Sequence, residues 1–152
     1  MRWLAGLLGL LLWSTAPAGD QQDIERATAH FLTSFENLDM PAFIACFAED
    51  ATAFFPAPEP PERVAGKAAI RSRFQQVFDE IHKGASGGPP YHRLEPQDLQ
   101  VQMLGTDAAV VTFHLRNSER LARRTLVMKK VQGAWLIAHL HASNFVKPAA
   151  TR

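Results

Sequence analysis

The sequence predicts an α+β fold in which three N-terminal helices pack on one face of a curved antiparallel sheet. Helical periodicity of apolar residues fills the first half of the chain, whereas strand-like alternation fills residues 99–145. Helices followed by an antiparallel meander are typical of α+β domains. The chain has 152 residues, which gives room for one domain with a real hydrophobic core.

The first eighteen residues are predicted to be a cleaved secretory signal peptide. Arg2 gives a positive start, residues 3–13 are apolar apart from glycines, and Ala16-Pro17-Ala18 supplies the small residues that a signal peptidase reads. An uncleaved membrane anchor is the alternative, but a spanning helix needs roughly twenty apolar residues. We therefore expect a periplasmic or secreted protein, with a domain over residues 19–147 and a flexible tail over 148–152.

Charge and cysteine content argue against several functions. Without the signal peptide, fifteen basic residues face fifteen acidic ones, so we expect no binding of nucleic acid and none of membranes after cleavage. Cys46 is the only cysteine, so neither an internal disulfide nor a cysteine-based zinc site can form. Its apolar neighbours favour a small buried side chain rather than a nucleophile. The P-loop, GxGxxG and GxSxG patterns do not occur, and we expect no cofactor.

The helices are predicted from apolar residues spaced three and four apart. Residues 20–38 form the first helix, with an apolar stripe made of Ile24, Ala27, Phe31, Phe35 and Leu38. Asp39 can cap a short second helix whose inward residues are Phe43 and Phe47. A third helix is expected from about Lys67 to His82, with a stripe made of Ile70, Phe74, Val77 and Ile81.

The remaining segments are assigned as strands, turns and loops. Residues 51–55 form a brief strand, residues 56–61 a stiff proline-rich loop, and residues 83–90 a mobile loop. The sheet then follows, with strands expected over 99–103, 108–115, 121–131 and 134–145. Gly133 can take the positive φ that the last hairpin turn requires.

The last strand determines which side chains face the core. Because successive side chains alternate across a strand, one face is predicted to look into the interior: Leu136, Ala138, Leu140 and Ala142. The opposite face carries Trp135, Ile137, His139, His141 and Ser143. Leu126 and Met128 are expected to face inward on the preceding strand, and Arg124 is in phase with them.

The two histidines have three competing interpretations. On the outer face, His139 and His141 would contact a second subunit, and this is the interpretation that we prefer. With His114 they could form a three-imidazole metal site, and inside a pocket they would be weak catalytic candidates. We expect a homo-oligomer, most simply a dimer, that assembles through the outer sheet face, and we expect no metal.

Several motifs resemble the nuclear transport factor 2-like superfamily, and the SnoaL-like group within it most of all. The motifs are Leu38–Phe43, Thr52–Pro56, Gly66, Leu104–Ala109 and Trp135–His141. They extend over roughly residues 20–145 and are also similar to the association domain of calcium/calmodulin-dependent kinases. The resemblance implies a cone-shaped α+β fold that hosts isomerases, dehydratases, cyclases and non-catalytic assembly domains.

Catalytic residues of these relatives are not found at the matching positions. Ketosteroid isomerase uses an aspartate base with a tyrosine and a protonated aspartate. Here the first helix offers Phe31 and Phe35 in place of the tyrosine, and residues 108–115 and 126–128 contain no acid. The arginines in the cone of the kinase association domain correspond to Leu115, Leu126 and Ala142.

The sequence therefore favours a self-associating domain whose cone holds a small hydrophobic molecule. A filled core without a cavity is equally compatible, and an isomerase-, dehydratase- or cyclase-type enzyme is the alternative. The expected ligand-binding residues are Arg124, Tyr91, Phe43, Phe54, Phe113, Leu126, Leu140 and Asn144. Arg124 could clamp a carboxylate at the mouth of the cone, or it could lie at a strand end and reach water.

Overall fold

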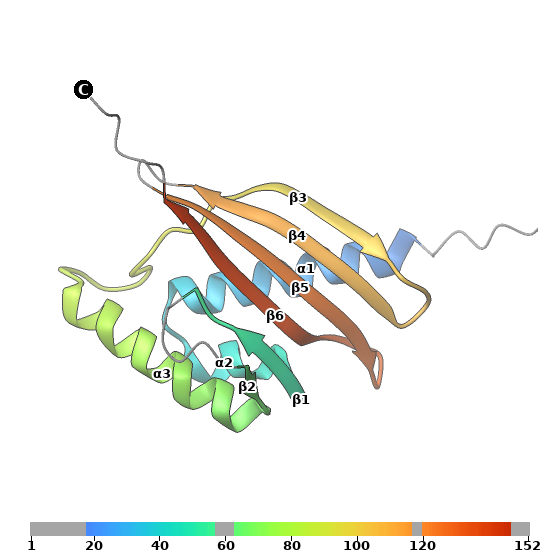
Figure 1. Cartoon of the computed structure of the whole chain (residues 1–152), viewed down its shortest axis with the longest axis horizontal. Helices are drawn as coiled ribbons and strands as arrows, with labels where there is room; N and C mark the ends of the chain where they lie inside the picture. The colour runs from blue at the N-terminus through green and yellow to red at the C-terminus, as the bar shows by residue number, and fades with distance from the viewer. Residues whose placement is uncertain (1–17, 57–62, 117–119, 147–152) are drawn as a thin grey trace, which may run out of the picture.

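In the part of the chain that the computed structural model describes, three helices cover one face of a six-stranded sheet (Figure 1). The structure describes residues 18–56, 63–116 and 120–146. The helices are α1 (Ala18–Glu36), α2 (Met40–Ala45) and α3 (Lys67–Gly84). The strands are β1 (Phe47–Phe54), β2 (Val64–Ala65), β3 (Pro96–Met103), β4 (Ala108–Arg116), β5 (Arg120–Val131) and β6 (Ala134–Val146).

Several predictions fall on residues outside those ranges. They are the signal peptide up to residue 17, the tail over 148–152 and most of the proline-rich loop. Among the described residues, no helix has the length and apolar character needed to cross a membrane.

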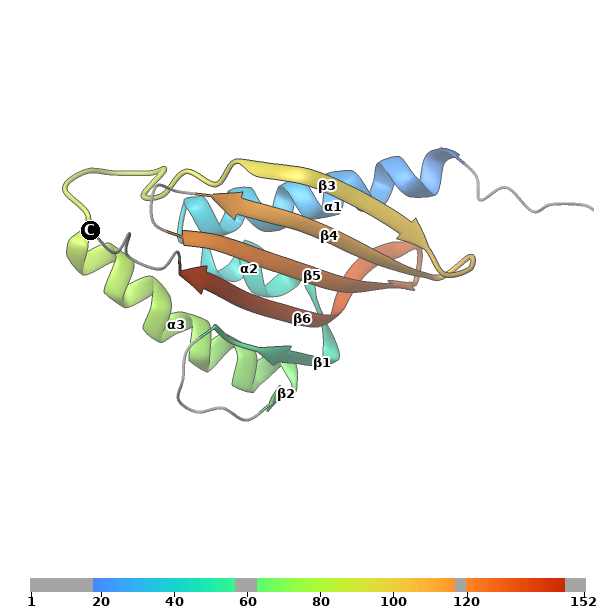
Figure 2. The ribbon, with the colours of Figure 1, turned by 45° about the horizontal axis from the view of Figure 1, so that its top comes forward.

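The sheet is curved and mixed, with the strand order β2-β1-β6-β5-β4-β3 (Figure 2). The predicted α+β class with helices on one face is confirmed. One strand pair differs from the antiparallel expectation, because β6 pairs in parallel with β1 on one side and antiparallel with β5 on the other. A parallel pair requires a long crossover connection, and here α3 and strands β3 to β5 provide it.

Local sequence explains where the elements start and turn. The Asp39 carboxylate accepts a hydrogen bond from the backbone N–H of Ala42 at 3.0 Å and so caps α2, as predicted. Gly66, with φ of 87°, is the N-cap residue directly before α3. Gln132 and Gly133 both have positive φ, which matches the type of two-residue turn whose twist suits a hairpin.

Six phenylalanines form the core between the helices and β1, with ring centroids 4.5–6.3 Å apart. They are Phe31, Phe35, Phe43, Phe47, Phe74 and Phe78. Phe47 is buried as expected, but it is the first residue of β1 rather than part of α2. Phe78, and not Ile81, completes the buried stripe of α3.

Strand β6 contains a β-bulge, and the predicted inward and outward faces of this strand are wrong before the bulge and correct after it. Met128 pairs with Ile137 and Val127 pairs with His139, so Ala138 is an extra residue without a partner on β5. Before the bulge, Trp135 and Ile137 are buried and Leu136 is only half-buried, which is the opposite of the prediction. After it, Leu140 and Ala142 are buried, as predicted. One added residue exchanges the two faces because side chains repeat every two residues.

Candidate functional site

A cavity of about 450 Å³ lies between the helices and the inner face of the sheet. Its deep wall is apolar, and each of its residues is at most 6% exposed: Phe31, Leu32, Phe74, Phe113, Leu140 and Ala142. Its mouth is polar and solvent-exposed, and consists of His92, Arg93, Glu95, Arg116 and Asn144. The cone is therefore hollow rather than filled, with the proportions of a site for a small hydrophobic molecule.

The strand register arranges the sheet side of this cavity in rows. Val111, Leu126 and Leu140 pair across β4, β5 and β6 in the packed core beneath the cavity, and of these three only Leu140 lines it. Phe113, Arg124 and Ala142 form the next row, and Leu115, Ala122 and Asn144 form the row nearest the mouth. Residues opposite one another in neighbouring strands share a face, so Arg124 is one row inside the mouth and not at the strand end.

The Arg124 guanidinium is held from one side by backbone. Its Nη1 donates to the carbonyls of Arg123 at 2.9 Å and Ser143 at 3.2 Å. Within the described residues no carboxylate forms an ion pair with it. Burial lowers the pKa of Arg124, because a desolvated cation is less stable than a hydrated one. Arginine nevertheless keeps its charge in proteins, so the cavity contains a fixed positive charge.

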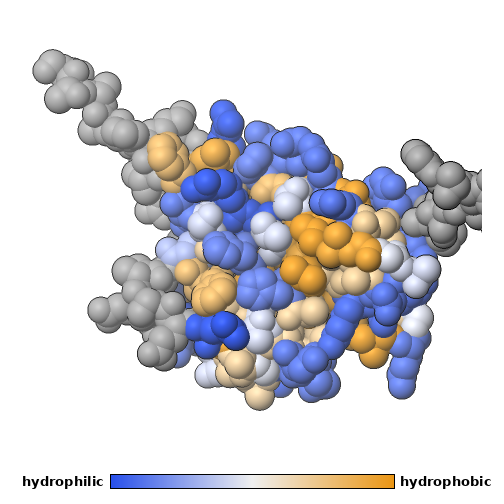
Figure 3. Space-filling model, turned by 45° about the vertical axis from the view of Figure 1, so that its right-hand side comes forward, coloured by the Kyte–Doolittle hydropathy of each residue, from blue (hydrophilic) through white to orange (hydrophobic). Residues whose placement is uncertain are grey.

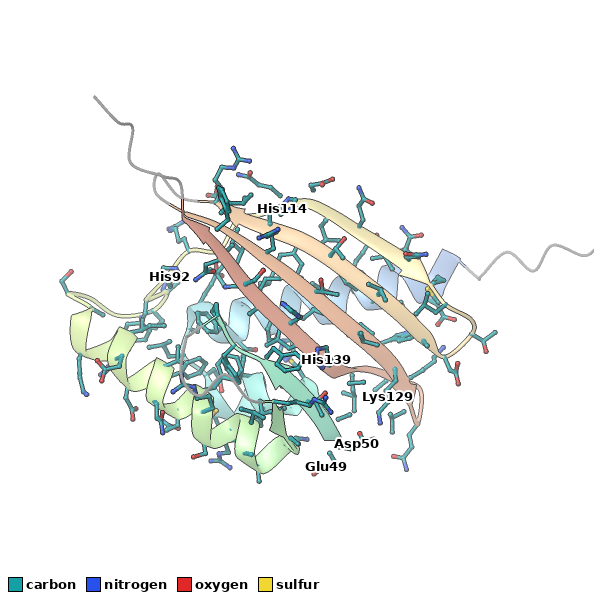
Figure 4. The ribbon with its side chains drawn as sticks, viewed as in Figure 1. Glu49, Asp50, His92, His114, Lys129 and His139 are labelled. Carbon is teal, nitrogen blue, oxygen red and sulfur yellow. The ribbon has the colours of Figure 1, made fainter. Side chains whose placement is uncertain are left out.

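Glu36, the last residue of α1, fixes one rim of the mouth. Its backbone carbonyl accepts from the N–H of Tyr91 at 2.8 Å and its carboxylate accepts from the N–H of Leu94 at 2.5 Å. The segment held by these two bonds, residues 91–95, includes His92, Arg93 and Glu95 of the mouth (His92 is labelled in Figure 4). The bond to the Glu36 carboxylate is charge-assisted, and together the two bonds connect this side of the mouth to the end of α1.

Four of the eight predicted ligand-binding residues line the cavity: Arg124, Phe113, Leu140 and Asn144. The other four do not. Phe43 and Leu126 are fully buried in the packed core, and Tyr91 packs its ring against His82 with a centroid separation of 5.2 Å. Phe54 faces the other side of the sheet, where it contacts the rings of His139 and His141.

Both weak catalytic candidates lie on the outer face of the sheet, away from the cavity (Figure 4 labels His139). His139 Nδ1 is 2.7 Å from Thr52 Oγ1 on β1. Burial, and after it electrostatic interactions with His141 and Arg63, lowers the pKa of His139. Neither imidazole can reach a molecule in the cone, so a catalytic role inside it is wrong for these two residues.

The described residues contain no cluster of histidine, cysteine and acidic side chains that could hold a metal ion. His114 is on β4, and β5 separates it from the other two histidines (Figure 4). Its ring lies 3.9 Å from the Asp98 carboxylate. Cys46 is buried and its Sγ donates to the carbonyl of Ala42. Burial raises the pKa of the Cys46 thiol to about 11, which keeps it protonated and unreactive.

Sequence reasoning missed several residues of the site. Arg93, Glu95 and Arg116 lie at element ends, where periodicity gives no direction, and Ala122 is too small to attract attention. Phe55 lines the cavity in place of its neighbour Phe54. The β1 alternation could have identified it, because Phe55 is in phase with Ala51 and Ala53, which are both buried.

Comparison with known proteins assigns this fold and cavity to a family. The model of the SnoaL-like domain matches residues 24–147. The chain belongs to the SnoaL-like domain family. This confirms the resemblance to the nuclear transport factor 2-like superfamily and its SnoaL-like group. No curated protein sequence matches the chain.

Solved structures of the same shape are similar at low sequence identity. A nuclear transport factor 2-like protein of unknown function from Pseudomonas putida is 20% identical over 91% of this chain and 95% of its own, with a TM-score of 0.72. A ketosteroid isomerase-like protein from Erwinia carotovora atroseptica is 19% identical over 86% and 99%, with a TM-score of 0.69. A proposed dehydratase of the family from Streptomyces avermitilis is 16% identical over 87% and 100%, with a TM-score of 0.70. These likenesses support the cone-shaped fold alone.

Proposed function

We propose that the protein binds one small hydrophobic molecule in the cone and does not convert it. The observation that carries the proposal is the cavity of about 450 Å³, whose deep wall is aromatic and aliphatic and whose polar groups gather at the mouth. Membership in the SnoaL-like domain family is compatible with the proposal, since the family resemblance implies a cone-shaped fold that hosts both enzymes and non-catalytic domains.

Native mass spectrometry of protein purified from its own host tests this proposal directly. A retained organic molecule, with the mass of one ligand per subunit, is the expected result. Apo protein can be titrated with phenylnaphthylamine, a neutral dye that fluoresces in apolar sites. Dye fluorescence that does not rise at any protein concentration, together with the absence of a retained ligand, would contradict the proposal.

The alternative, an isomerase-, dehydratase- or cyclase-type enzyme, now depends on two residues that the sequence did not single out for proton transfer. His92 and Glu95 are side chains at the mouth that could exchange a proton with a bound molecule. Both are solvent-exposed and stand outside the apolar wall. A substrate whose turnover is lost in His92→Ala or Glu95→Gln, with its binding retained, would favour the enzyme.

The protein is further proposed to self-associate through the outer sheet face. The outward positions of the register include half-buried apolar residues, namely Ala108, Val110, Val127 and Leu136. Hydrophobic surface gathers in a patch over the sheet with hydrophilic surface around it (Figure 3). We expect a second copy of the chain to pack on this patch, because in a two-fold dimer the same patch meets itself. The charged groups beside it, Lys129 and Asp50, have opposite signs and so do not repel an identical surface (Figure 4).

Sedimentation velocity checks the self-association. Val127→Arg places a charge in the centre of the patch and is expected to give a monomer, whereas the control Gln22→Arg on the exposed face of α1 keeps the dimer. A Val127→Arg protein that sediments as the wild type would contradict the interface, and a monomeric wild type would contradict self-association itself.

Secretion is also a proposal. Cleavage after Ala18 would remove one residue of α1 and keep every other described residue. Intact mass of the protein recovered from the cell envelope is expected to correspond to a chain beginning at Gly19. A full-length mass, or recovery from the cytoplasm alone, would contradict it.

A further inference from the structure

We infer that the molecule held in the cone carries a carboxylate, and that the side-on edge of Arg124 binds it. This inference rests on the proposed function, because it specifies the chemical class of the ligand in the same cavity. The ligand would lie with its apolar tail on the aromatic wall and its head one row inside the mouth.

The first argument is that, among the described residues, Arg124 has no carboxylate beside it on the inner face. The strand register surrounds it with four neighbours, namely Ala122 and Leu126 on its own strand, Phe113 on β4 and Ala142 on β6. None of them is charged. A charge placed among apolar groups is costly unless it is paired, so an anionic ligand would supply what these neighbours do not.

The second argument concerns which atoms of Arg124 remain available. Backbone carbonyls of Arg123 and Ser143 take Nη1. No oxygen of the described residues bonds to Nε or Nη2, which together form the side-on edge of the guanidinium. That edge presents two parallel N–H groups, and the planar pair of oxygens in a carboxylate matches it.

The third argument is that the cavity has room for a ligand beside Arg124. Two of the four neighbours, Ala122 and Ala142, are small, and both line the cavity together with Arg124. The two carbonyl bonds hold the guanidinium in place before a ligand arrives, so less freedom is lost on binding. The cavity continues from this point to the aromatic wall of Phe31 and Phe74, which would receive an alkyl or ring system.

Calorimetric titration with octanoate and with octanol tests the inference, since the two molecules share a tail and differ in the head group. Wild-type protein is expected to bind octanoate about tenfold to a hundredfold more tightly than octanol, the range for hydrogen bonds to charged groups. Arg124→Met is expected to lose this preference and still bind octanol. The control Arg123→Met, whose side chain is exposed on the other face, is expected to keep it.

The possible outcomes separate the two proposals. Equal affinity of the wild type for both molecules would overturn the carboxylate inference and leave hydrophobic binding standing, whereas binding of neither would overturn both. A preference that survives in Arg124→Met would also overturn the role of this residue. If Arg124→Met does not fold, Arg124→Lys serves instead: it keeps the charge, loses the two-pronged edge, and is expected to lower the preference for octanoate.

Discussion

His139 Nδ1 and Thr52 Oγ1 lie 2.7 Å apart across the parallel pair of β1 and β6. The bond connects the only two strands that pair in parallel among the described residues, and it directs the imidazole to the outer face of the sheet. Phe54, two residues further along β1, packs against the same ring. This small polar and aromatic cluster is therefore part of the surface proposed for self-association and not of the cavity.

The lowered pKa of His139 predicts that part of the stability is lost in mild acid. Its folded-state pKa is below the ordinary value of about 6.5, so the unfolded chain binds the proton more readily. The contribution is fully present above about pH 6.5 and is lost as the pH falls through the folded-state pKa. Urea unfolding should show the wild type losing stability relative to His139→Gln over that interval. A difference between the two proteins that is independent of pH would contradict the shift.

Arg63 should contribute to that shift. Removing its charge in Arg63→Gln is expected to raise the pKa of His139 toward the ordinary value, because a nearby cation disfavours the imidazolium. Titration of the histidine signals by nuclear magnetic resonance measures the pKa of His139 in both proteins. Arg71→Gln, on the exposed side of α3, serves as the control and should leave the pKa unchanged.

The bulge at Ala138 predicts unequal costs for two leucines that a regular strand would treat alike. Leu140 is 2% exposed, so Leu140→Ala should cost about 2–5 kcal/mol of unfolding free energy through lost burial and a new void. Leu136 is half-buried on the outer face, and Leu136→Ala should cost less than half as much in the monomer. Chemical denaturation compares the two. Equal losses would mean that the bulge is placed wrongly.

The two lysines at the end of β5 should also differ. Lys130 donates to Asp20 at 2.5 Å and lies over the Trp135 ring, while Lys129 donates to the largely exposed Asp50 at the same distance. Lys130→Met leaves the buried Asp20 carboxylate without its cation and should destabilise the protein more than Lys129→Met. Because Lys130 lowers the pKa of Asp20, the extra loss should shrink as the pH falls below the ordinary aspartate value. An unchanged difference in acid would contradict this account.

Ala122 should control entry to the cavity. It lies in the row nearest the mouth, beside Arg124, so Ala122→Trp is expected to fill the opening and lower dye affinity by about tenfold or more, the scale of lost apolar contact. The control Ala29→Trp lies on the exposed side of α1 and should bind as the wild type does. Fluorescence titration measures both, and undiminished binding by Ala122→Trp would place the ligand elsewhere.

The sequence predicted the helices and strands well because their apolar spacing is regular over long segments. It predicted the inward phase of Arg124, Leu126 and Met128 for the same reason: no bulge interrupts β5 at these positions. It failed where one residue breaks the repeat, as Ala138 does, since nothing in an alanine marks a bulge. The parallel pairing of β1 with β6 was also missed, because a contact between residues 47–54 and 137–141 leaves no local pattern.

The strand order has a consequence for how the chain acquires its structure. Strand β6 is the last to leave the ribosome, yet it is the one that joins the β1–β2 pair to the β3–β4–β5 meander. Until residues 134–146 are available, the two parts of the sheet have no hydrogen bonds between them, and the wall that carries Leu140 and Ala142 does not exist. A nascent chain that stops short of this segment would therefore leave the edges of β1 and β5 that pair with β6 without a partner strand, and chaperone contact should be strongest at that length.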